Sequence, residues 1–204
     1  MISMQMNLKR VMGGCLVALL MLMLAPSVWA GSIAPAGDAG KLLQESQQAL
    51  KAGDTAKALE RADKAVFSLW QQAPFKVAYW TLQKGKAGGY GIYQPREDNV
   101  YLKDEPIYIY IEPWAYKLAQ LAPDVFGLAL AMDAYVMDTS GKVLFGKENF
   151  LKMAKKSHRR ARQMYINVTM NLTGAPAGKY IIKLVVKDLV GGGQSAIRVP
   201  VEFQ

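Results

Sequence analysis

Apolar residues recur at two different spacings along the chain, and the change occurs near Pro74. From about residue 37 to residue 72, the apolar positions follow the three-to-four-residue repeat that marks one face of a helix. After Pro74 they alternate with polar positions, which is typical of strands with one buried face. The pattern therefore predicts an α+β protein in which helices are followed by a β domain.

The helical part contains two apolar runs separated by a turn. Their apolar positions are Leu42, Leu43, Ala49 and Leu50, then Ala58, Leu59, Ala62, Ala65, Val66 and Leu69. Between the runs, Gly53 can close the first helix, and Asp54 or Thr55 can cap the second. We predict an antiparallel helical hairpin within residues 31–73. Its apolar face must be buried on another part of the protein, because two helices cannot bury both their faces alone.

The same segment resembles a single tetratricopeptide repeat. The resemblance lies in Leu50-Lys51-Ala52-Gly53-Asp54, followed by Ala58-Leu59 and Ala62. Arrays of such repeats need about three units to bury a continuous core, and one unit is visible here. A helical hairpin packed on the following domain is therefore favoured over a repeat scaffold that binds peptides.

Alternation and turn residues divide the second part of the chain into seven short strands. The clearest alternation places Ile107, Ile109 and Ile111 on one face of a strand. Strands are predicted near residues 75–82, 107–112, 126–137, 143–150, 164–172, 180–188 and 196–203. Seven strands with frequent turns and no intervening helices predict an antiparallel immunoglobulin-like β-sandwich over residues 74–204.

The first thirty residues have the pattern of a secretory signal peptide. Lys9 and Arg10 precede an uncharged apolar run, Pro26 ends that run, and Ala30 provides a small residue at the cleavage site. The alternative is an uncleaved anchor, because residues 11–30 are uncharged and could just span a bilayer. We expect cleavage and export to the periplasm, with secretion as the second choice, and no integral membrane span after cleavage.

The net charge of +9 is concentrated in the last quarter of the chain. Residues 31–150 carry 13 basic and 14 acidic side chains, whereas residues 151–204 carry 10 basic and 2 acidic ones. Six of those ten cations lie in one short stretch: Lys152, Lys155, Lys156, Arg159, Arg160 and Arg162. Because the stretch falls between two predicted strands, we expect it to be a sheet edge or a protruding inter-strand loop, and we call residues 151–162 the basic loop.

Three interpretations of this basic loop are open. An anionic envelope lipid or glycan would be attracted by about 1 kcal/mol per cation. An acidic envelope protein would be attracted similarly and would gain mainly association rate. A solvated run of Lys and Arg could also serve only to prevent strand pairing. Export argues against nucleic acid as the partner. The candidate binding residues here are Lys155, Lys156, Arg159, Arg160 and Arg162.

Aromatic residues gather before this stretch, and they form a second candidate region: Tyr90, Tyr93, Tyr101, Tyr108, Tyr110, Trp114 and Tyr116. The face opposite Ile107 to Ile111 could be open and bind sugars or peptides. It could instead be covered by the helical hairpin, which is favoured because the hairpin needs a surface to pack on. Candidate binding residues are Tyr90, Tyr93 and Arg96, and Arg96 either pairs with Glu112 under that cover or stays exposed.

The sequence offers little for catalysis. The single histidine, His158, lies among cations without a neighbouring carboxylate, so a solvated loop histidine is favoured over a catalytic base. The glycine-rich residues 85–91 lack the features of a phosphate loop. We predict a non-catalytic binding or envelope-assembly protein without cofactor or metal. The alternative is a glycan hydrolase that uses carboxylates about 5 to 10 Å apart. Its candidates are Glu97, Asp98, Glu105 and Glu112.

Two motifs carry a resemblance to exported bacterial proteins. Pro176-Ala177-Gly178-Lys179-Tyr180, followed by Lys187-Asp188, is similar to the penultimate hairpin of bacterial extracytoplasmic immunoglobulin-like modules. The run from Gly89 to Arg96, followed by Asn99, Glu105-Pro106 and residues 110–113, is similar to exported bacterial proteins of uncharacterised function. The resemblance implies a fold and a compartment, and it brings no catalytic residues.

Overall fold

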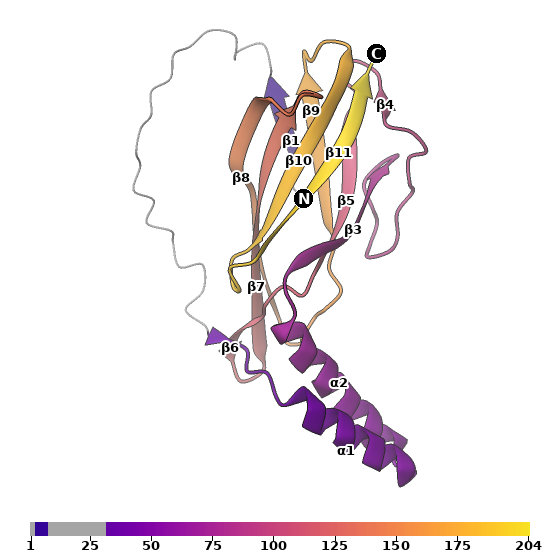
Figure 1. Cartoon of the computed structure of the whole chain (residues 1–204), viewed down its shortest axis with the longest axis vertical. Coiled ribbons are helices and arrows are strands. Elements are labelled where there is room, and N and C mark those ends of the chain that lie inside the picture. The colour runs from indigo at the N-terminus through magenta and orange to yellow at the C-terminus, as the bar shows by residue number, and fades with distance from the viewer. Residues whose placement is uncertain (1–2, 8–31) are drawn as a thin grey trace.

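The described part of the chain folds into a mainly β structure with two helices (Figure 1). The computed structural model describes residues 3–7 as backbone and residues 32–204 with their side chains. The predicted leader, residues 1–30, therefore lies outside the described residues except for strand β1 (Ser3–Asn7). Within the described part of the chain, neither helix is long and apolar enough to cross a membrane.

The two helices occur where the apolar spacing predicts them. Helix α1 spans Ala39–Lys51 and helix α2 spans Thr55–Gln72. The carboxylate of Asp54 accepts a hydrogen bond from the Lys57 amide at 3.0 Å and so caps α2. Gly53 adopts a φ of 77°, which is the left-handed conformation that glycine tolerates after a helix. The turn chemistry therefore sets both helix boundaries as expected.

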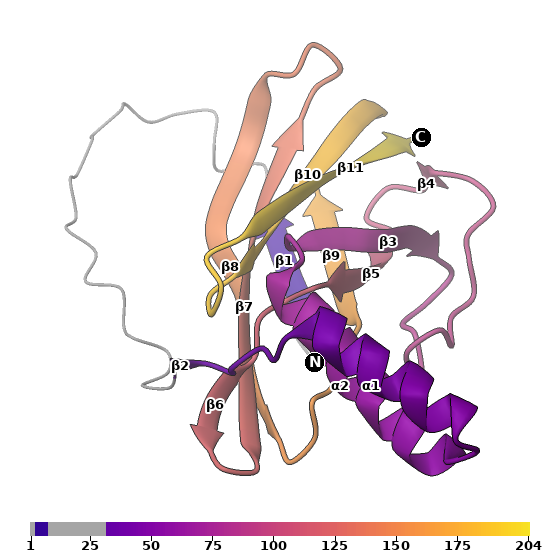
Figure 2. The ribbon, with the colours of Figure 1, turned by 60° about the horizontal axis from the view of Figure 1, so that its bottom comes forward.

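Helix α2 contacts the β part of the protein through aromatic residues outside the predicted apolar stripe. The Trp70 indole Nε1 donates to the Tyr116 carbonyl at 2.8 Å, and the ring of Phe67 lies 6.4 Å from that of Phe126. Figure 2 shows both helices at one end of the sheets. The Lys117 ammonium closes the end of α2 by donating to the Trp70 and Ala73 carbonyls.

The prediction that the whole apolar face of the helices is buried is wrong. Ala58 and Ala65 are buried as expected, but Leu59, Val66 and Leu69 are exposed by 73%, 46% and 49%. The side of α2 that faces the sheets is rotated toward positions 67, 70 and 71. Two aromatic rings bury more apolar surface there than the shorter side chains of the predicted stripe could.

The strands form two sheets. One sheet has the order β1-β9-β5-β3, built from β3 (Lys76–Gln83), β5 (Ile107–Trp114) and β9 (Ile166–Thr173) together with β1. The other has the order β2-β6-β7-β10-β11-β4, and β8 pairs with β7. Its strands are β2 (Ser32–Ile33), β4 (Val100–Tyr101), β6 (Ala119–Ala122), β7 (Val125–Met137), β8 (Val143–Ser157), β10 (Gly178–Asp188) and β11 (Gln194–Phe203). The pairs β1–β9 and β4–β11 are parallel, and the other pairs are antiparallel.

The apolar faces of the two sheets meet in one core. Ile107, Ile109 and Ile111 of β5 are fully buried, which confirms the alternation read from the sequence. They belong to the same cluster as Leu130 of β7 and Ile182 of β10, from the other sheet. The strands predicted from period-two alternation are therefore the strands that build the core.

Of the two alternatives for the basic stretch, the sheet edge is confirmed for residues 151–157, and the protruding loop is wrong for them. Strand β8 continues to Ser157, and its pairing with β7 is unbroken from Leu151↔Met132 to Ser157↔Phe126. Figures 1 and 2 show β8 at the edge of its sheet. Because β8 lies at the edge of its sheet, more of both its faces is exposed to solvent. Lysines are therefore tolerated at successive positions, and the alternation of apolar and polar residues that would predict a strand is lost.

Tyr101 provides a test of the core beside β4. Its side chain is 1% exposed, and its hydroxyl has no hydrogen-bond partner among the described residues. Burial raises the pKa of Tyr101 to about 12. Because the folded state holds the hydroxyl neutral, stability should be full below the unfolded pKa of about 10 and should fall as the pH rises toward 12.

We therefore expect Tyr101→Phe to be as stable as the natural protein at pH 7, or more stable by up to about 1 kcal/mol, because an unpaired buried hydroxyl is removed. Between pH 10 and 12 the variant should lose less stability than the natural protein. Urea unfolding at pH 7, 10 and 11.5 measures both effects. A variant that is clearly less stable at pH 7 would mean that the hydroxyl is satisfied in solution.

Candidate functional site

A groove of about 590 Å³ lies between β8, the edge strand of one sheet, and the first part of β9 in the other sheet. Its walls include residues 151–155 of β8 and Tyr165, Ile166, Asn167 and Thr169 at and before the start of β9. A second cavity of about 190 Å³ adjoins it and shares Lys155 and Tyr165 with it. The two hollows are therefore neighbours that share part of their walls, and we call them together the edge groove.

The edge groove follows the free edge of β8 and the part of β9, residues 166–168, that β1 leaves uncovered. Successive side chains of a strand point to opposite faces, so a surface lined by consecutive residues is the edge of the strand. Residues 151–155 all line the groove, and so do residues 165–167. The unpaired backbone N–H and C=O groups of an edge strand lie along such a surface. The groove thus presents backbone as well as side chains.

Cations dominate the charged groups of the edge groove. Five basic residues line it: Lys86, Lys152, Lys155, Lys156 and Arg159. No Asp or Glu is among the described residues that line it. Along β8, Lys155 lies two residues after Met153 and four after Leu151, so its side chain points to the same face of the strand. Leu151 and Met153 pack on the core, so that face is the groove side of β8. The groove is therefore electropositive.

Two tyrosines add aromatic surface to the edge groove. Tyr90 is 42% exposed, and Tyr165 stacks on Tyr110 with ring centroids 5.6 Å apart. Partial burial and the nearby Glu112 carboxylate raise the pKa of Tyr90 above its usual value of 10. The Tyr90 hydroxyl therefore already interacts with the Glu112 carboxylate, and Tyr90 contributes its ring to the groove lining. Tyr90, predicted as a binding residue, is thus brought together with Lys155, Lys156 and Arg159.

The outer face of β5 is covered by the 84–95 loop, and the predicted cover by the helices is wrong. The Asn167 amide holds this loop by two hydrogen bonds to the Ala87 backbone, at 3.0 and 3.2 Å. The Gly91 amide donates to the Tyr110 hydroxyl at 2.8 Å, and Tyr110 is fully buried. The helices pack elsewhere because their aromatic residues fit the Tyr116 and Phe126 end of the sheets.

Tyr93 belongs to this cover. Its ring lies 4.5 Å from that of Tyr110 and 5.9 Å from that of Tyr79. A hydrogen bond with Tyr79 raises the pKa of Tyr93 to about 12. Tyr93 does not line the edge groove; it lines a separate hollow beside Lys86 and Ile92. The structure thus separates Tyr93 from Lys155, Lys156 and Arg159, whereas Tyr90 joins them.

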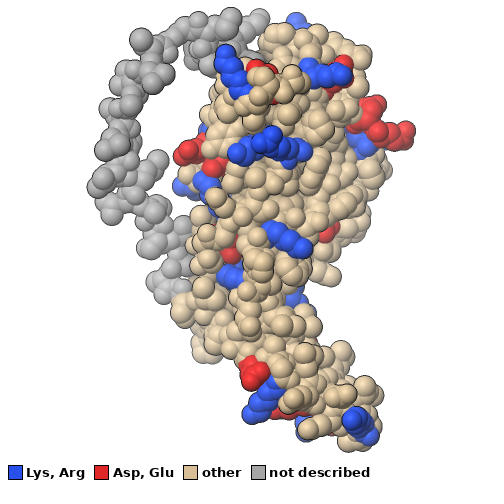
Figure 3. All heavy atoms as spheres, in the orientation of Figure 1, with Lys and Arg blue, Asp and Glu red and all other residues tan. Residues whose placement is uncertain are grey.

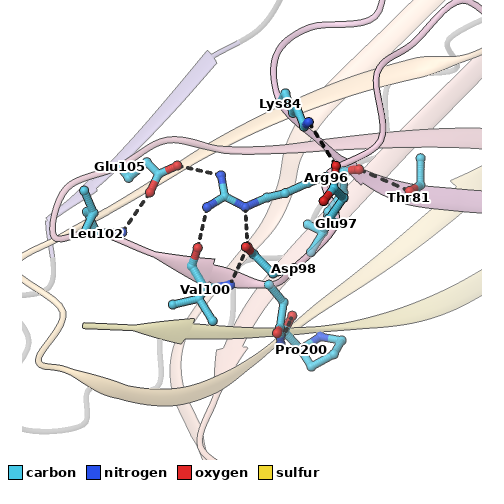
Figure 4. A network of polar contacts seen from close by, with 11 residues as sticks. Thr81, Lys84, Arg96, Glu97, Asp98, Val100, Leu102, Glu105 and Pro200 are labelled. Atoms are coloured by element: carbon cyan, nitrogen blue, oxygen red, sulfur yellow. Dashed lines mark hydrogen bonds and ion pairs between the residues drawn. The ribbon is translucent and has the colours of Figure 1, made fainter.

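Arg96 pairs with two carboxylates that the sequence did not assign to it. Its guanidinium donates to Asp98 at 2.9 Å, to Glu105 at 2.6 Å and to the Val100 carbonyl (Figure 4). It also lies over the Tyr101 ring, 4.2 Å from the centroid. The pairing with Glu112 is therefore wrong, because Glu105 and Asp98 are nearer along the folded loop. Arg96 holds the 96–105 segment in place and is not a free binding group.

The last cations of the basic stretch connect the sheets to α2. The Arg162 guanidinium donates to Asp63 at 2.7 Å, and Arg160 lies over the Phe67 ring, 4.3 Å from the centroid. His158 lies 3.2 Å from the exposed Asp124 carboxylate, which sequence proximity could not reveal. Among the predicted basic residues, Arg160 and Arg162 therefore contact α2, whereas Lys155, Lys156 and Arg159 line the groove.

The four carboxylates proposed for hydrolysis do not line the edge groove. Asp98 and Glu105 both bind Arg96, Glu97 lies 3.4 Å from the Lys84 ammonium, and Glu112 accepts from the Tyr110 hydroxyl at 2.7 Å. The hydrogen bond from Arg96 lowers the pKa of Asp98. In the described part of the chain, no group of three or more His, Cys, Asp or Glu side chains is placed to hold a metal ion.

The face that carries β10 and β11 has a different charge pattern. Figure 3 shows Lys and Arg side chains dispersed over this face, with Asp and Glu among them. The edge groove, by contrast, combines five cations with no lining carboxylate among the described residues. Of the surfaces considered, the groove is therefore the one best suited to an anion.

Comparisons with known proteins leave the family open. No known family and no curated protein matches the chain. Among solved structures, the chain is similar at 14% identity to the Pseudomonas fluorescens alkylpurine DNA glycosylase AlkC bound to DNA containing an abasic site analog. That match has a TM-score of 0.34 and covers 76% of this chain but only 40% of the glycosylase. The CARDB domain of a Pyrococcus furiosus protein in complex with di-metal ions matches at 11% identity and a TM-score of 0.29, covering 65% of this chain and 93% of that domain.

Proposed function

We propose that this protein is a non-catalytic binding protein that holds an anionic partner in the edge groove. The observation that carries the proposal is the convergence of Lys86, Lys152, Lys155, Lys156 and Arg159 on one groove with no lining carboxylate among the described residues. Such a field attracts and orients anions. The Tyr90 ring lies beside these cations in the groove lining.

The proposal includes the finer architecture and the location read from the sequence. We take the strand order as that of an immunoglobulin-like sandwich, with β3, β5 and β9 in one sheet and β8, β7, β10 and β11 in the other. We take α1 and α2 as a helical hairpin on its end. The leader pattern supports export, so the partner is an anionic component of the cell envelope, such as an acidic protein segment.

A triple variant tests this function. Changing Lys152, Lys155 and Arg159 to Ser should weaken binding of a labelled oligoglutamate probe by about ten- to a hundredfold at low salt, at about 0.5–1 kcal/mol per lost charge pair. Fluorescence anisotropy measures the affinities. Binding by the natural protein should also weaken as salt is raised, because the cations are accessible to solvent.

The matched control removes three exposed lysines outside the groove. Lys103, Lys142 and Lys147 are exposed and do not line either hollow of the groove. Changing them to Ser lowers the net charge equally but should change the affinity less than about threefold. Equal weakening by both triple variants would attribute the binding to overall charge and would refute the groove as the site.

A further inference from the structure

The edge groove contains a strand edge that already accepts a strand. The backbone of β1 pairs in parallel with β9, in the register Ser3↔Thr169 to Asn7↔Thr173. On its other side, β9 pairs with β5 over residues 166–170. The N-terminal part of β9, residues 166–168, has no strand on its outer edge among the described residues. That uncovered edge lies in the groove.

The geometry points to strand addition as the binding mode, and this inference rests on the proposed function. We propose that an extended acidic segment of a partner protein adds as a further strand to the outer edge of β9 within the edge groove. Main-chain hydrogen bonds to β9 would supply affinity, as in other complexes formed by strand addition. Cleavage of the predicted leader would remove β1 and extend the open edge from residue 166 to residue 173.

The charge of the groove selects the composition of the added strand. Alternate side chains of an extended segment point to opposite sides. Lys86 belongs to the loop over the outer face of the β9 sheet, whereas Lys152 and Lys155 belong to β8 on the opposite wall. An added strand would therefore have cations on both walls, and Glu or Asp on either of its faces would be neutralised. A basic segment would be repelled.

The sides of the groove also carry apolar and aromatic surface for the same strand. Met153 is partly buried against the core, Tyr165 lies on the outer face of the β9 sheet, and both line the groove. An acidic segment with interspersed Val or Ile would match this lining better than a polyanion without apolar groups. A folded acidic surface would not reach the strand edge, because a strand edge is paired only by extended backbone.

Peptides with and without backbone N–H groups test strand addition separately from charge. The probe is a labelled peptide in which Glu alternates with Val. Two modified peptides have the same sequence, and each carries N-methyl groups at every second residue, so that one edge of the extended peptide lacks N–H donors. Fluorescence anisotropy measures the binding of each peptide to the full-length protein and to the protein from which the predicted leader has been removed. We expect the unmodified peptide to bind. The peptide whose N-methyl groups lie on the edge that pairs with β9 should bind at least about tenfold more weakly. Both N-methylation patterns are used, since either edge of the peptide can face β9.

The outcomes distinguish the two proposals. If one N-methylation pattern weakens binding and the Lys152, Lys155 and Arg159 to Ser variant weakens it further, strand addition is supported. Equal binding of all peptides, with loss in the triple variant, overturns strand addition and leaves the anion-binding function standing. Binding of anionic phospholipid vesicles without binding of any peptide overturns strand addition and assigns the groove to a membrane surface. Failure of the peptides and the vesicles alike would overturn both proposals.

Discussion

Replacing Trp70 by alanine is expected to lower the free energy of unfolding by about 3–5 kcal/mol. The side chain is 7% exposed, its rings lie 5.5 Å from Trp114 and 5.3 Å from Tyr116, and its indole N–H is bonded to the Tyr116 carbonyl. The substitution removes a large apolar contact and leaves a buried carbonyl without its donor. Urea unfolding followed by circular dichroism measures the loss.

Two further substitutions, one at Trp70 itself and one at the neighbouring Leu69, give reference values for this loss of stability. Trp70→Phe keeps most of the ring contact and should cost about 1–2 kcal/mol, mainly for the lost hydrogen bond. Leu69→Ala should cost less than about 1 kcal/mol, because Leu69 is 49% exposed. If Trp70→Ala were no more destabilising than Leu69→Ala, the helices would not be held on the sheets through Trp70.

Replacing Arg96 by alanine should cost about 2–3 kcal/mol, the second-largest effect expected here. The Arg96 side chain is 21% exposed, and that of Glu105 is 28% exposed, so their hydrogen bond is only partly screened by solvent. Loss of the guanidinium would leave the Glu105 carboxylate and the Val100 carbonyl without this donor. Asp98 adds less, because it is 61% exposed. Urea unfolding of the variant measures the cost.

The contacts of Arg96 with Asp98, Glu105 and the Val100 carbonyl form what we call the Arg96 clamp. Arg96→Lys and Lys84→Ala are the controls for this clamp. Lysine keeps the charge but cannot reach three acceptors with a planar fork, so Arg96→Lys should recover less than half of the loss. Lys84→Ala removes an exposed ion pair with Glu97 and should change stability by less than about 0.5 kcal/mol. Equal effects of Arg96→Ala and Lys84→Ala would contradict the clamp.

The elements that bury one face could be predicted from the sequence, because burial imposes a period. Ile107, Ile109 and Ile111 are buried as the alternation required. Asp54 caps α2, as the local residue types indicated. The second half of β8 could not be predicted in this way. Lys152, Lys155 and Lys156 lie on both faces of an edge strand, where solvent removes the constraint that produces alternation.

The cover of β5 and the edge groove depend on contacts between distant segments. Ala87 and Asn167 are 80 residues apart, and Tyr90 and Lys155 come together only through the packing of the loop and two strands. No local spacing encodes such a meeting. One signal was available: Tyr165 and Asn167 occupy the outer-facing positions of the alternation that buries Ile166 and Val168. These outer positions indicated a face outside the core, but neither the loop that covers it nor the groove beside it.

The central claim is that an anionic partner occupies the groove between β8 and β9. Amide hydrogen exchange, with and without a saturating Glu and Val peptide, tests it most directly, because exchange reports the protection of individual strand segments. The account predicts slower exchange in residues 151–157 and 165–169 and little change in α1 and α2. Protection confined to the helices, or no protection of either strand at saturation, would contradict it.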